Sequence, residues 1–216
     1  MTQIRLQAMP TIIAQTERWL VLAKPAGWLS IPGRGESLGV LSDWATSEIK
    51  SPVWTVHRLD RETSGVILFA LSEKAHQEAN RWFAAHTVKK IYDCLAEGLP
   101  RAPVLKLNGP VEGRKSLTQI EVKELYQEGF LAQVRPLTGR RHQIRIHLSG
   151  EGHPIWGDTL YKGAKEIRIK TDTFGVPRVA LHARRLELPG GEKYECPWPH
   201  DFSEWVERLR KGGTRV

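Results

Sequence analysis

The sequence predicts a single α+β domain in which strands and helices are mixed along the chain rather than strictly alternating. Short apolar runs rich in Val, Ile and aromatic residues are typical of buried strands, and apolar stripes at spacings of three and four are typical of helices. Both patterns occur in irregular order over the 216 residues, without a linker-like segment or an internal repeat. We therefore expect one domain over residues 12–212, preceded by a flexible arm over residues 1–11.

The N-terminal part of the chain predicts a strand, a turn and a helix. Residues 19–23, Trp-Leu-Val-Leu-Ala, form a strand-like run, and the Pro and Gly of residues 24–28 predict a turn after it. Ser37 is a suitable cap for a helix whose apolar residues follow at helical spacing. This helix has to end before Pro52, because the residue before a proline avoids helical dihedral angles.

A polar segment, residues 57–65, lies between two apolar runs at residues 53–56 and 66–70. The two runs predict strands, and the Thr-Ser-Gly at the end of the segment is turn chemistry. Ser72 then predicts the cap of a second helix, which carries one apolar stripe. A strand over residues 89–96 follows this helix.

The C-terminal half predicts a hairpin, an ambiguous segment and a final helix. The hairpin pairs residues 117–126 with residues 130–137 around a Gly-containing turn. Residues 138–150 fit either a strand or a short helix, and we favour the helix because Ser-Gly is a suitable terminus. After a strand over residues 179–188, Asp201 predicts the start of the last helix in the manner of a capping box.

The charge balance predicts a polyanionic partner. The chain has a formal net charge of +8 at pH 7, and its basic residues stand in separate clusters along the sequence. Nucleic acid is the usual partner of such a protein, although a generally basic surface is an alternative explanation. No apolar run is long enough to span a membrane, and no secretory signal is recognisable. The two cysteines do not form a Cys-x-x-Cys pair, so we expect reduced thiols and a cytoplasmic protein.

The sequence contains no motif for several common kinds of catalytic and cofactor site. The sequence lacks the glycine-rich motifs of dinucleotide and nucleotide sites, the GxSxG motif of hydrolases and the HExxH motif of zinc enzymes. His142 and His147 stand five residues apart without further Cys or His ligands nearby. They are therefore better explained as hydrogen-bonding residues than as metal ligands, and we expect neither a metal nor a cofactor.

The residue that stands out for catalysis is Asp60, which lies between Arg58 and Arg61 in the polar segment. Nearby positive charge favours the ionised carboxylate. An ionised Asp is able to act as a nucleophile, as a base or as a stabiliser of a sugar cation. The segment taken alone also fits a surface loop with ordinary ion pairs.

The polar segment, His-Arg-Leu-Asp-Arg-Glu-Thr-Ser-Gly, resembles the HRLDxxTSG signature of the RluA family of RNA pseudouridine synthases. Further segments resemble that family's motifs in the same order, over roughly residues 13–188. They are KPxG at residues 24–27, KxY at 90–92, TGRTHQIRxHL at 138–148, GHPIxGD at 152–158 and LHA at 181–183. One departure is Arg141, which stands where the family often has Thr, and we expect it to alter RNA contacts rather than chemistry.

The resemblance implies a mixed, mostly antiparallel sheet flanked by helices, with a central basic cleft. It also implies isomerisation of a specific uridine in ribosomal or transfer RNA to pseudouridine, without metal or cofactor. By position, Asp60 is the catalytic aspartate, Tyr92 is the ring that packs on the target base, and Arg145 is the ion-pair partner of Asp60. A plain core aromatic is the alternative for Tyr92.

The expected RNA-binding residues include three arginines, Arg58, Arg140 and Arg141, that contact phosphates or fill the space left by a flipped base. To these we add Arg61, Lys24 and Lys90. Idle surface ion pairs are the alternative for Arg58 and Arg61, and a plain turn residue is the alternative for Lys24.

The small N-terminal S4-type RNA-binding domain of many relatives has no counterpart ahead of the family-like region. We therefore expect that the catalytic domain itself recognises a short stem-loop. A monomer is the default expectation, since the sequence does not indicate the oligomeric state. Two other functions compete with this one. A non-catalytic RNA-binding or assembly protein would share the fold, and a glycosidase-type hydrolase would require a second carboxylate opposite Asp60.

Overall fold

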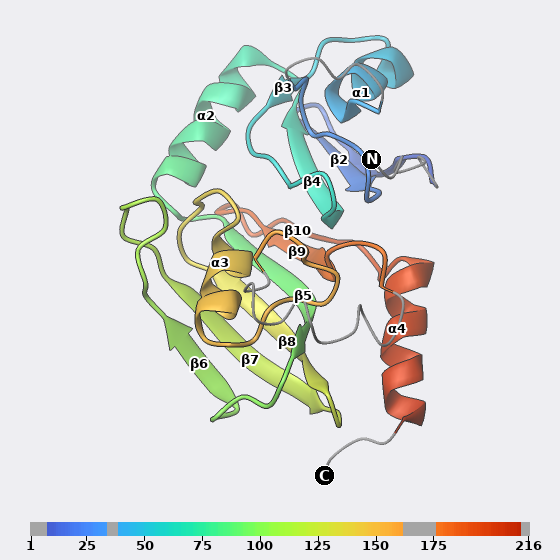
Figure 1. Ribbon diagram of the computed structural model, residues 1–216. Helices are drawn as coiled ribbons and strands as arrows, with labels where there is room; N and C mark the ends of the chain where they lie inside the picture. Colours follow the sequence, from blue (N-terminus) through green and yellow to red (C-terminus); the bar gives the residue numbers. More distant parts are fainter. Residues whose placement is uncertain (1–7, 34–38, 162–175, 213–216) are drawn as a thin grey trace. The chain divides into compact units, whose positions relative to one another are not determined.

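The computed structural model describes residues 8–33, 39–161 and 176–212. The chain forms two compact units (Figure 1). The first contains residues 1–90 and 183–197, and the second contains residues 91–182 and 198–216. The chain passes between the units within strands β5 (Lys89–Glu97) and β9 (Leu181–Glu187).

The first unit is organised around the buried strand β4 (Ser64–Ala70), all seven residues of which are buried. β4 pairs antiparallel with β2 and β3 and is also a neighbour of β9. β2 and β9 in turn pair antiparallel with β1 and β10. Helix α2 packs against β4. The remaining elements are β1 (Thr11–Gln15), β2 (Trp19–Lys24), α1 (Leu41–Ile49), β3 (Trp54–Thr55), α2 (Glu73–Ala84) and β10 (Lys193–Glu195).

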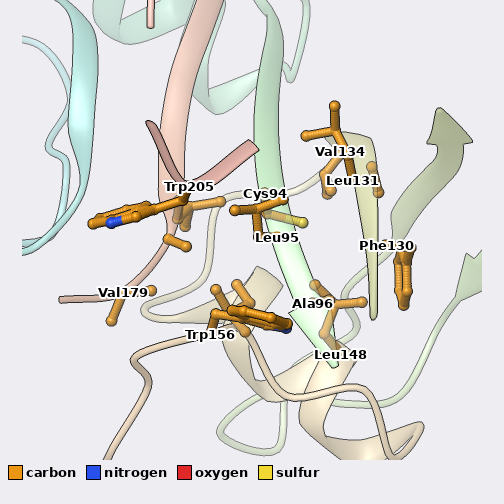
Figure 2. Packing of buried hydrophobic residues seen from close by; sticks show 14 of the residues in the cluster. Cys94, Leu95, Ala96, Phe130, Leu131, Val134, Leu148, Trp156, Val179 and Trp205 are labelled. Atoms are coloured by element: carbon orange, nitrogen blue, oxygen red, sulfur yellow. The ribbon is translucent and has the colours of Figure 1, made fainter. Parts of the chain in front are cut away.

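The second unit has the strand order β5-β8-β7-β6, and each neighbouring pair is antiparallel. Helix α3 packs on β7 and β8 (Figure 1). Buried residues from the strands, from α3 and from α4 form one apolar cluster, which includes Leu95, Phe130, Leu148 and Trp205 (Figure 2). The elements not yet placed are β6 (Val104–Leu107), β7 (Thr118–Leu125), β8 (Gly129–Pro136), α3 (Gln143–Gly150) and α4 (His200–Lys211).

The predicted α+β class and the mostly antiparallel pairing are confirmed. The ambiguous segment forms helix α3, as favoured, because one of its faces packs on the sheet of the second unit. The second predicted helix is α2, and its cap is Ser72, whose Oγ accepts a hydrogen bond of 3.2 Å from the backbone N–H of Ala75. The central basic cleft stays a prediction.

The structure does not confirm the predicted caps of the two other helices. Helix α4 begins at His200 with Pro199 as its N-cap and without a side-chain cap bond. The helix start predicted at Asp201 is therefore wrong, because α4 begins one residue earlier, at His200. The Asp201 carboxylate accepts from Arg178 at 2.8 and 3.0 Å and also from the adjacent N–H of Phe202 at 2.7 Å. Ser37 lies outside the described residues, and α1 is described from Leu41 onward.

Three short strands, β1, β6 and β10, were not expected from the sequence. Most of their residues are exposed or half-buried, so they lack the apolar alternation on which the prediction of a strand rests. Most of the arm expected over residues 1–11 lies outside the described residues, and β1 begins at Thr11. In the part of the chain that the structure describes, no helix is both long and apolar enough to cross a membrane.

A close backbone approach at the start of β4 requires glycine. Gly65 has φ of +120°, a conformation that residues with a side chain rarely adopt. A β-carbon at this position would lie 2.2 Å from the carbonyl oxygen of Ala183 in β9. Gly65, which lies in β4 and not in the turn predicted for Thr-Ser-Gly, thus lets β4 and β9 approach closely where the polar segment ends.

Gly65→Ala is expected to lower the free energy of unfolding by about 3 kcal/mol, because it adds both backbone strain and a steric clash. Gly191→Ala is the matched control, since Gly191 has φ of +92° and a β-carbon there would meet no atom within 4 Å. Urea unfolding of both variants measures the difference. Equal losses would mean that φ alone, and not the contact with Ala183, requires glycine.

Candidate active site

The backbone on both sides of Asp60 is held by hydrogen bonds from another loop of the first unit. Ser30 Oγ donates to the carbonyl of Leu59 at 2.8 Å and accepts from the Leu59 N–H at 3.0 Å. The N–H of Gly27 donates to the carbonyl of Arg61 at 2.8 Å, and Arg61 Nε donates back to the Gly27 carbonyl at 3.1 Å. These reciprocal pairs fix the direction in which the half-buried Asp60 leaves the backbone.

Lys24 reinforces the same connection from inside the unit. Lys24 is 1% exposed. Its Nζ donates to the carbonyls of Pro25 at 3.0 Å, Arg61 at 3.0 Å and Thr63 at 2.7 Å. An ammonium group has three N–H bonds, and these three carbonyls suit it, so Lys24 holds the connection that carries Asp60. The expected contact of Lys24 with RNA stays a prediction.

The two arginines beside Asp60 differ in their surroundings. Arg61 is half-buried, and its Nε bond to Gly27 makes it part of the loop scaffold. Arg58 is exposed, as a residue that contacts a polyanion has to be. The roles of both in RNA binding stay predictions.

His57 begins the polar segment and is held as a neutral imidazole. Its ring stacks on Phe83 with centroids 4.7 Å apart, and its Nε2 accepts a hydrogen bond of 3.0 Å from the N–H of Leu68. Burial, and to a lesser degree the positive charge of Lys90, lowers the pKa of His57 from 6.5 to about 3. At neutral pH this histidine carries no positive charge and serves to anchor the segment.

Lys90, at the start of β5, is half-buried, and burial lowers its pKa from 10.5 to about 8. At pH 7 the side chain is therefore still mostly cationic, as the predicted contact with RNA requires.

In the same strand Tyr92 is half-buried and packs against the apolar cluster of the second unit. It thus has part of the character of a core aromatic, but its surface is not wholly covered.

In the second unit, Arg145 of α3 forms a buried bidentate ion pair with Asp158. Arg145 Nε donates to Oδ2 at 2.7 Å and Nη2 donates to Oδ1 at 2.8 Å. Arg145 is 6% exposed and Asp158 is 1% exposed. Sequence reasoning gave Asp158 no role, although the GHPIxGD resemblance ends on this residue. The expected pairing of Arg145 with Asp60 joins residues of different units and stays a prediction.

The turn before α3 is closed by the side chain of Gln143. The side-chain Oε1 of Gln143 accepts from Thr138 Oγ1 at 2.6 Å and from the Arg140 N–H at 3.1 Å. The backbone N–H of Gln143 donates to the Arg140 carbonyl at 3.2 Å. Arg140 Nε is buried and has no hydrogen-bond partner among the described residues. Arg141 is exposed. The turn thus presents two arginines on a rigid backbone, and the contribution of Gln143 was not anticipated from the sequence.

The two histidines considered as ligands make hydrogen bonds within the second unit. His147 is buried, with Nδ1 2.8 Å from Thr118 Oγ1 and Nε2 2.8 Å from the carbonyl of Gly109. His142 Nδ1 lies 2.8 Å from the hydroxyl of Tyr161. Within the described ranges, no group of three or more His, Cys, Asp or Glu side chains is placed to hold a metal ion.

Comparison with known proteins gives a consistent set of likenesses. A family model described as RNA pseudouridylate synthase matches residues 18–150. The "Dual-specificity RNA pseudouridine synthase RluA" of Salmonella typhi is 34% identical over 199 residues, which are 82% of this chain and 85% of that protein. The "Ribosomal large subunit pseudouridine synthase C" of Vibrio parahaemolyticus is 32% identical over 210 residues, or 91% of this chain.

The chain spans only part of the length of some relatives, 64% for the Vibrio parahaemolyticus protein and 62% for its counterpart in Vibrio cholerae. Among solved structures, "Human RNA Pseudouridylate Synthase Domain Containing 4" matches with a TM-score of 0.76. The match covers 92% of each chain at 24% identity, so it is evidence for the fold alone.

Lys24→Met is expected to lower the free energy of unfolding by about 3 kcal/mol, because three carbonyls lose their donor in a buried place. Lys74→Met, at an exposed position of α2, is the control and should change stability by less than about 0.5 kcal/mol. Chemical denaturation of both variants measures the effect. Similar values for the two would contradict the scaffold role of Lys24.

His57 should make stability depend on pH. Its pKa is about 3 in the folded chain and 6.5 in the unfolded chain, so the unfolded state binds the extra proton between these values. The stabilisation is therefore complete above pH 6.5 and declines as pH falls toward 3, by at most about 1.4 kcal/mol per pH unit.

Urea unfolding between pH 4 and 7 tests this, with His57→Gln expected to flatten the wild-type slope. His200→Gln should keep the wild-type slope, because the side chain of His200 is 89% exposed. Parallel curves for wild type and His57→Gln would show that folding does not lower the pKa of His57, and would contradict its neutral role.

Proposed function

We propose, since the chain belongs to the RluA family of RNA pseudouridine synthases, that this protein isomerises a uridine in RNA to pseudouridine. The observation that carries the proposal is the rigid presentation of Asp60, whose backbone neighbours on both sides are held by reciprocal hydrogen bonds. A catalytic carboxylate has to be held in this way to act on a substrate of fixed geometry.

The chemistry requires an anionic group and no co-reactant. The bond between N1 of the base and C1′ of the ribose breaks, the base turns, and C5 bonds to C1′. C5 then loses its proton and N1 gains one, so atoms and electrons balance within the nucleotide. Asp60 is the proposed anion, acting at C1′, at C6 or as the base that removes the proton from C5. The target uridine has to leave the helical stack to reach it.

The family resemblance assigns two further residues to the proposed site, Tyr92 and Arg145. Tyr92, which is half-buried in β5, would stack on the base while it is detached from the sugar. Arg145 would pair with Asp60 and keep it ionised. Within the second unit, the bidentate bond to Asp158 through Nε and Nη2 already holds the Arg145 guanidinium in place.

The proposed RNA contacts come from cations that the fold leaves partly or fully accessible. Arg58 and Arg141 are exposed, and Arg61, Lys90 and Arg140 are half-buried. The buried Nε of Arg140, without a partner among the described residues, is a donor that a phosphate oxygen would satisfy. With the net charge of +8, these residues favour a polyanionic substrate.

The names of the relatives point to the class of RNA, since one of them acts on the large ribosomal subunit and another has dual specificity. We propose a stem-loop of ribosomal or transfer RNA as the substrate. The monomeric state, the cytoplasmic location and the single domain over residues 12–212 stay predictions.

Asp60→Asn should abolish pseudouridine formation, with a loss of at least about a thousandfold in the single-turnover rate. The affinity for RNA should change less than about twofold, because the amide keeps the shape of the carboxylate. Asp43→Asn, at an exposed position of α1, is the matched control and should keep the wild-type rate. Pseudouridine mapping of unmodified ribosomal and transfer RNA measures the product.

A wild-type protein that binds these RNAs but forms no pseudouridine on any of them would contradict the proposal. That outcome would indicate a non-catalytic RNA-binding protein. Release of free base or sugar would instead indicate a hydrolase.

A further inference from the structure

Arg145 lies in a small cluster of side chains that restricts its guanidinium from several directions. Besides the two bonds to Asp158, the ring of Tyr161 lies below the guanidinium, with Arg145 Cζ 5.1 Å from the ring centroid. A cation over an aromatic face is attracted by the ring quadrupole, and more strongly where both are removed from water. Two bonds to one carboxylate and a ring contact together restrict the position of the guanidinium.

Asp158 is itself rigidly held. Its Oδ1 accepts the backbone N–H groups of Leu160 at 3.0 Å and Tyr161 at 3.2 Å. The preceding Gly157 has φ of +73°, and a β-carbon there would lie 2.0 Å from the carbonyl oxygen of Arg178. The turn therefore cannot shift toward Arg178, and the carboxylate is fixed before it binds Arg145.

Tyr161 is tied to both ends of helix α3. Its hydroxyl shares a hydrogen bond of 2.8 Å with Nδ1 of His142, the residue before the helix, and its carbonyl accepts a hydrogen bond from Ser149 Oγ near the end of the helix. Arg145 lies on α3 between these two attachments. The loop that carries Asp158 and Tyr161 is thus attached to α3 around Arg145.

We infer that Asp158 and Tyr161 are positioning residues for the isomerisation, which act by aiming Arg145. The inference rests on the proposed function, in which Arg145 pairs with the catalytic carboxylate. Asp158 binds Nε and Nη2 in a buried bidentate pair, and the Tyr161 ring lies against the guanidinium, so the position of the Arg145 head group is fixed within the second unit. A cation fixed in advance needs no reorganisation when charge develops on the substrate, which is the condition for efficient electrostatic catalysis.

The second unit contains a matched ion pair to which we assign no catalytic task. Arg178 binds Asp201 through Nε and Nη2 at 2.8 and 3.0 Å, and Arg178 Cζ lies 5.0 Å from the ring centroid of Trp205. The bonding pattern is the same as around Arg145, but the Asp201 side chain is 38% exposed whereas that of Asp158 is 1% exposed. Asp201→Asn therefore measures what the loss of a bidentate pair does to stability alone.

The first experiment compares single-turnover rates at saturating RNA, well below the melting temperature of every variant. Asp158→Asn should lower the rate by roughly a hundredfold, the cost of a misplaced catalytic group, and should leave the dissociation constant for RNA within about twofold. Asp201→Asn should keep the rate within about threefold of wild type. Equal rates for the two variants would overturn the inference.

A double-mutant cycle separates positioning from any direct role of Asp158. In an Arg145→Lys background, Asp158→Asn should lower the rate by less than about threefold, because the group that it aims has already been replaced. A full hundredfold loss in that background would show that Asp158 acts independently of Arg145. If Asp158→Asn does not fold, Tyr161→Leu replaces it in the same cycle, with a loss of about tenfold expected.

A third measurement does not depend on activity. The Nε–Hε resonance of Arg145, assigned by its loss in Arg145→Lys, should show a rigid and slowly exchanging side chain in the wild type and in Asp201→Asn. It should become mobile in Asp158→Asn, and a side chain that stays rigid there would overturn the inference. Failure of the proposed function is recognised separately, by a wild type that makes no pseudouridine although Arg145 is rigid.

Discussion

The bonds from the ammonium of Lys24 to three backbone carbonyls are the interaction on which the candidate site depends. The carbonyls belong to Pro25, Arg61 and Thr63, so one buried cation ties the end of β2 to the connection that carries Asp60. A buried charge is costly unless hydrogen bonds surround it. A compact ammonium with three donors suits three converging carbonyls, whereas the planar guanidinium of Arg would not.

The two units prepare charged groups by the same physical means. In the first, main-chain hydrogen bonds hold the segment around Asp60, and in the second a buried carboxylate holds Arg145. In both cases the ordering entropy of the charged group is lost on folding rather than when a ligand binds. Neutral His57, stacked on Phe83, contributes to this rigidity without adding a charge beside Asp60.

Much of the fold was predictable because its central elements are buried. Strand β4 and helix α2 follow from apolar runs and from the cap at Ser72, since local pattern and tertiary packing agree there. Prediction failed at the periphery. β1 and β10 have few buried residues, so hydrophobic pattern carries no signal for them. Asp201 matched a helix cap, but α4 begins at His200, and the carboxylate of Asp201 also binds Arg178, which is distant in sequence.

The sequence by itself determined the family, the α+β class and the identity of Asp60, Tyr92 and Arg145 as candidate residues, because motif order and local pattern are properties of the chain. Only the tertiary structure decided what holds them. Lys24 reaches carbonyls 37 and 39 residues away, and Arg145 binds a carboxylate 13 residues away. Such partners are chosen by which polar groups the packing buries together, and residue spacing does not encode that choice.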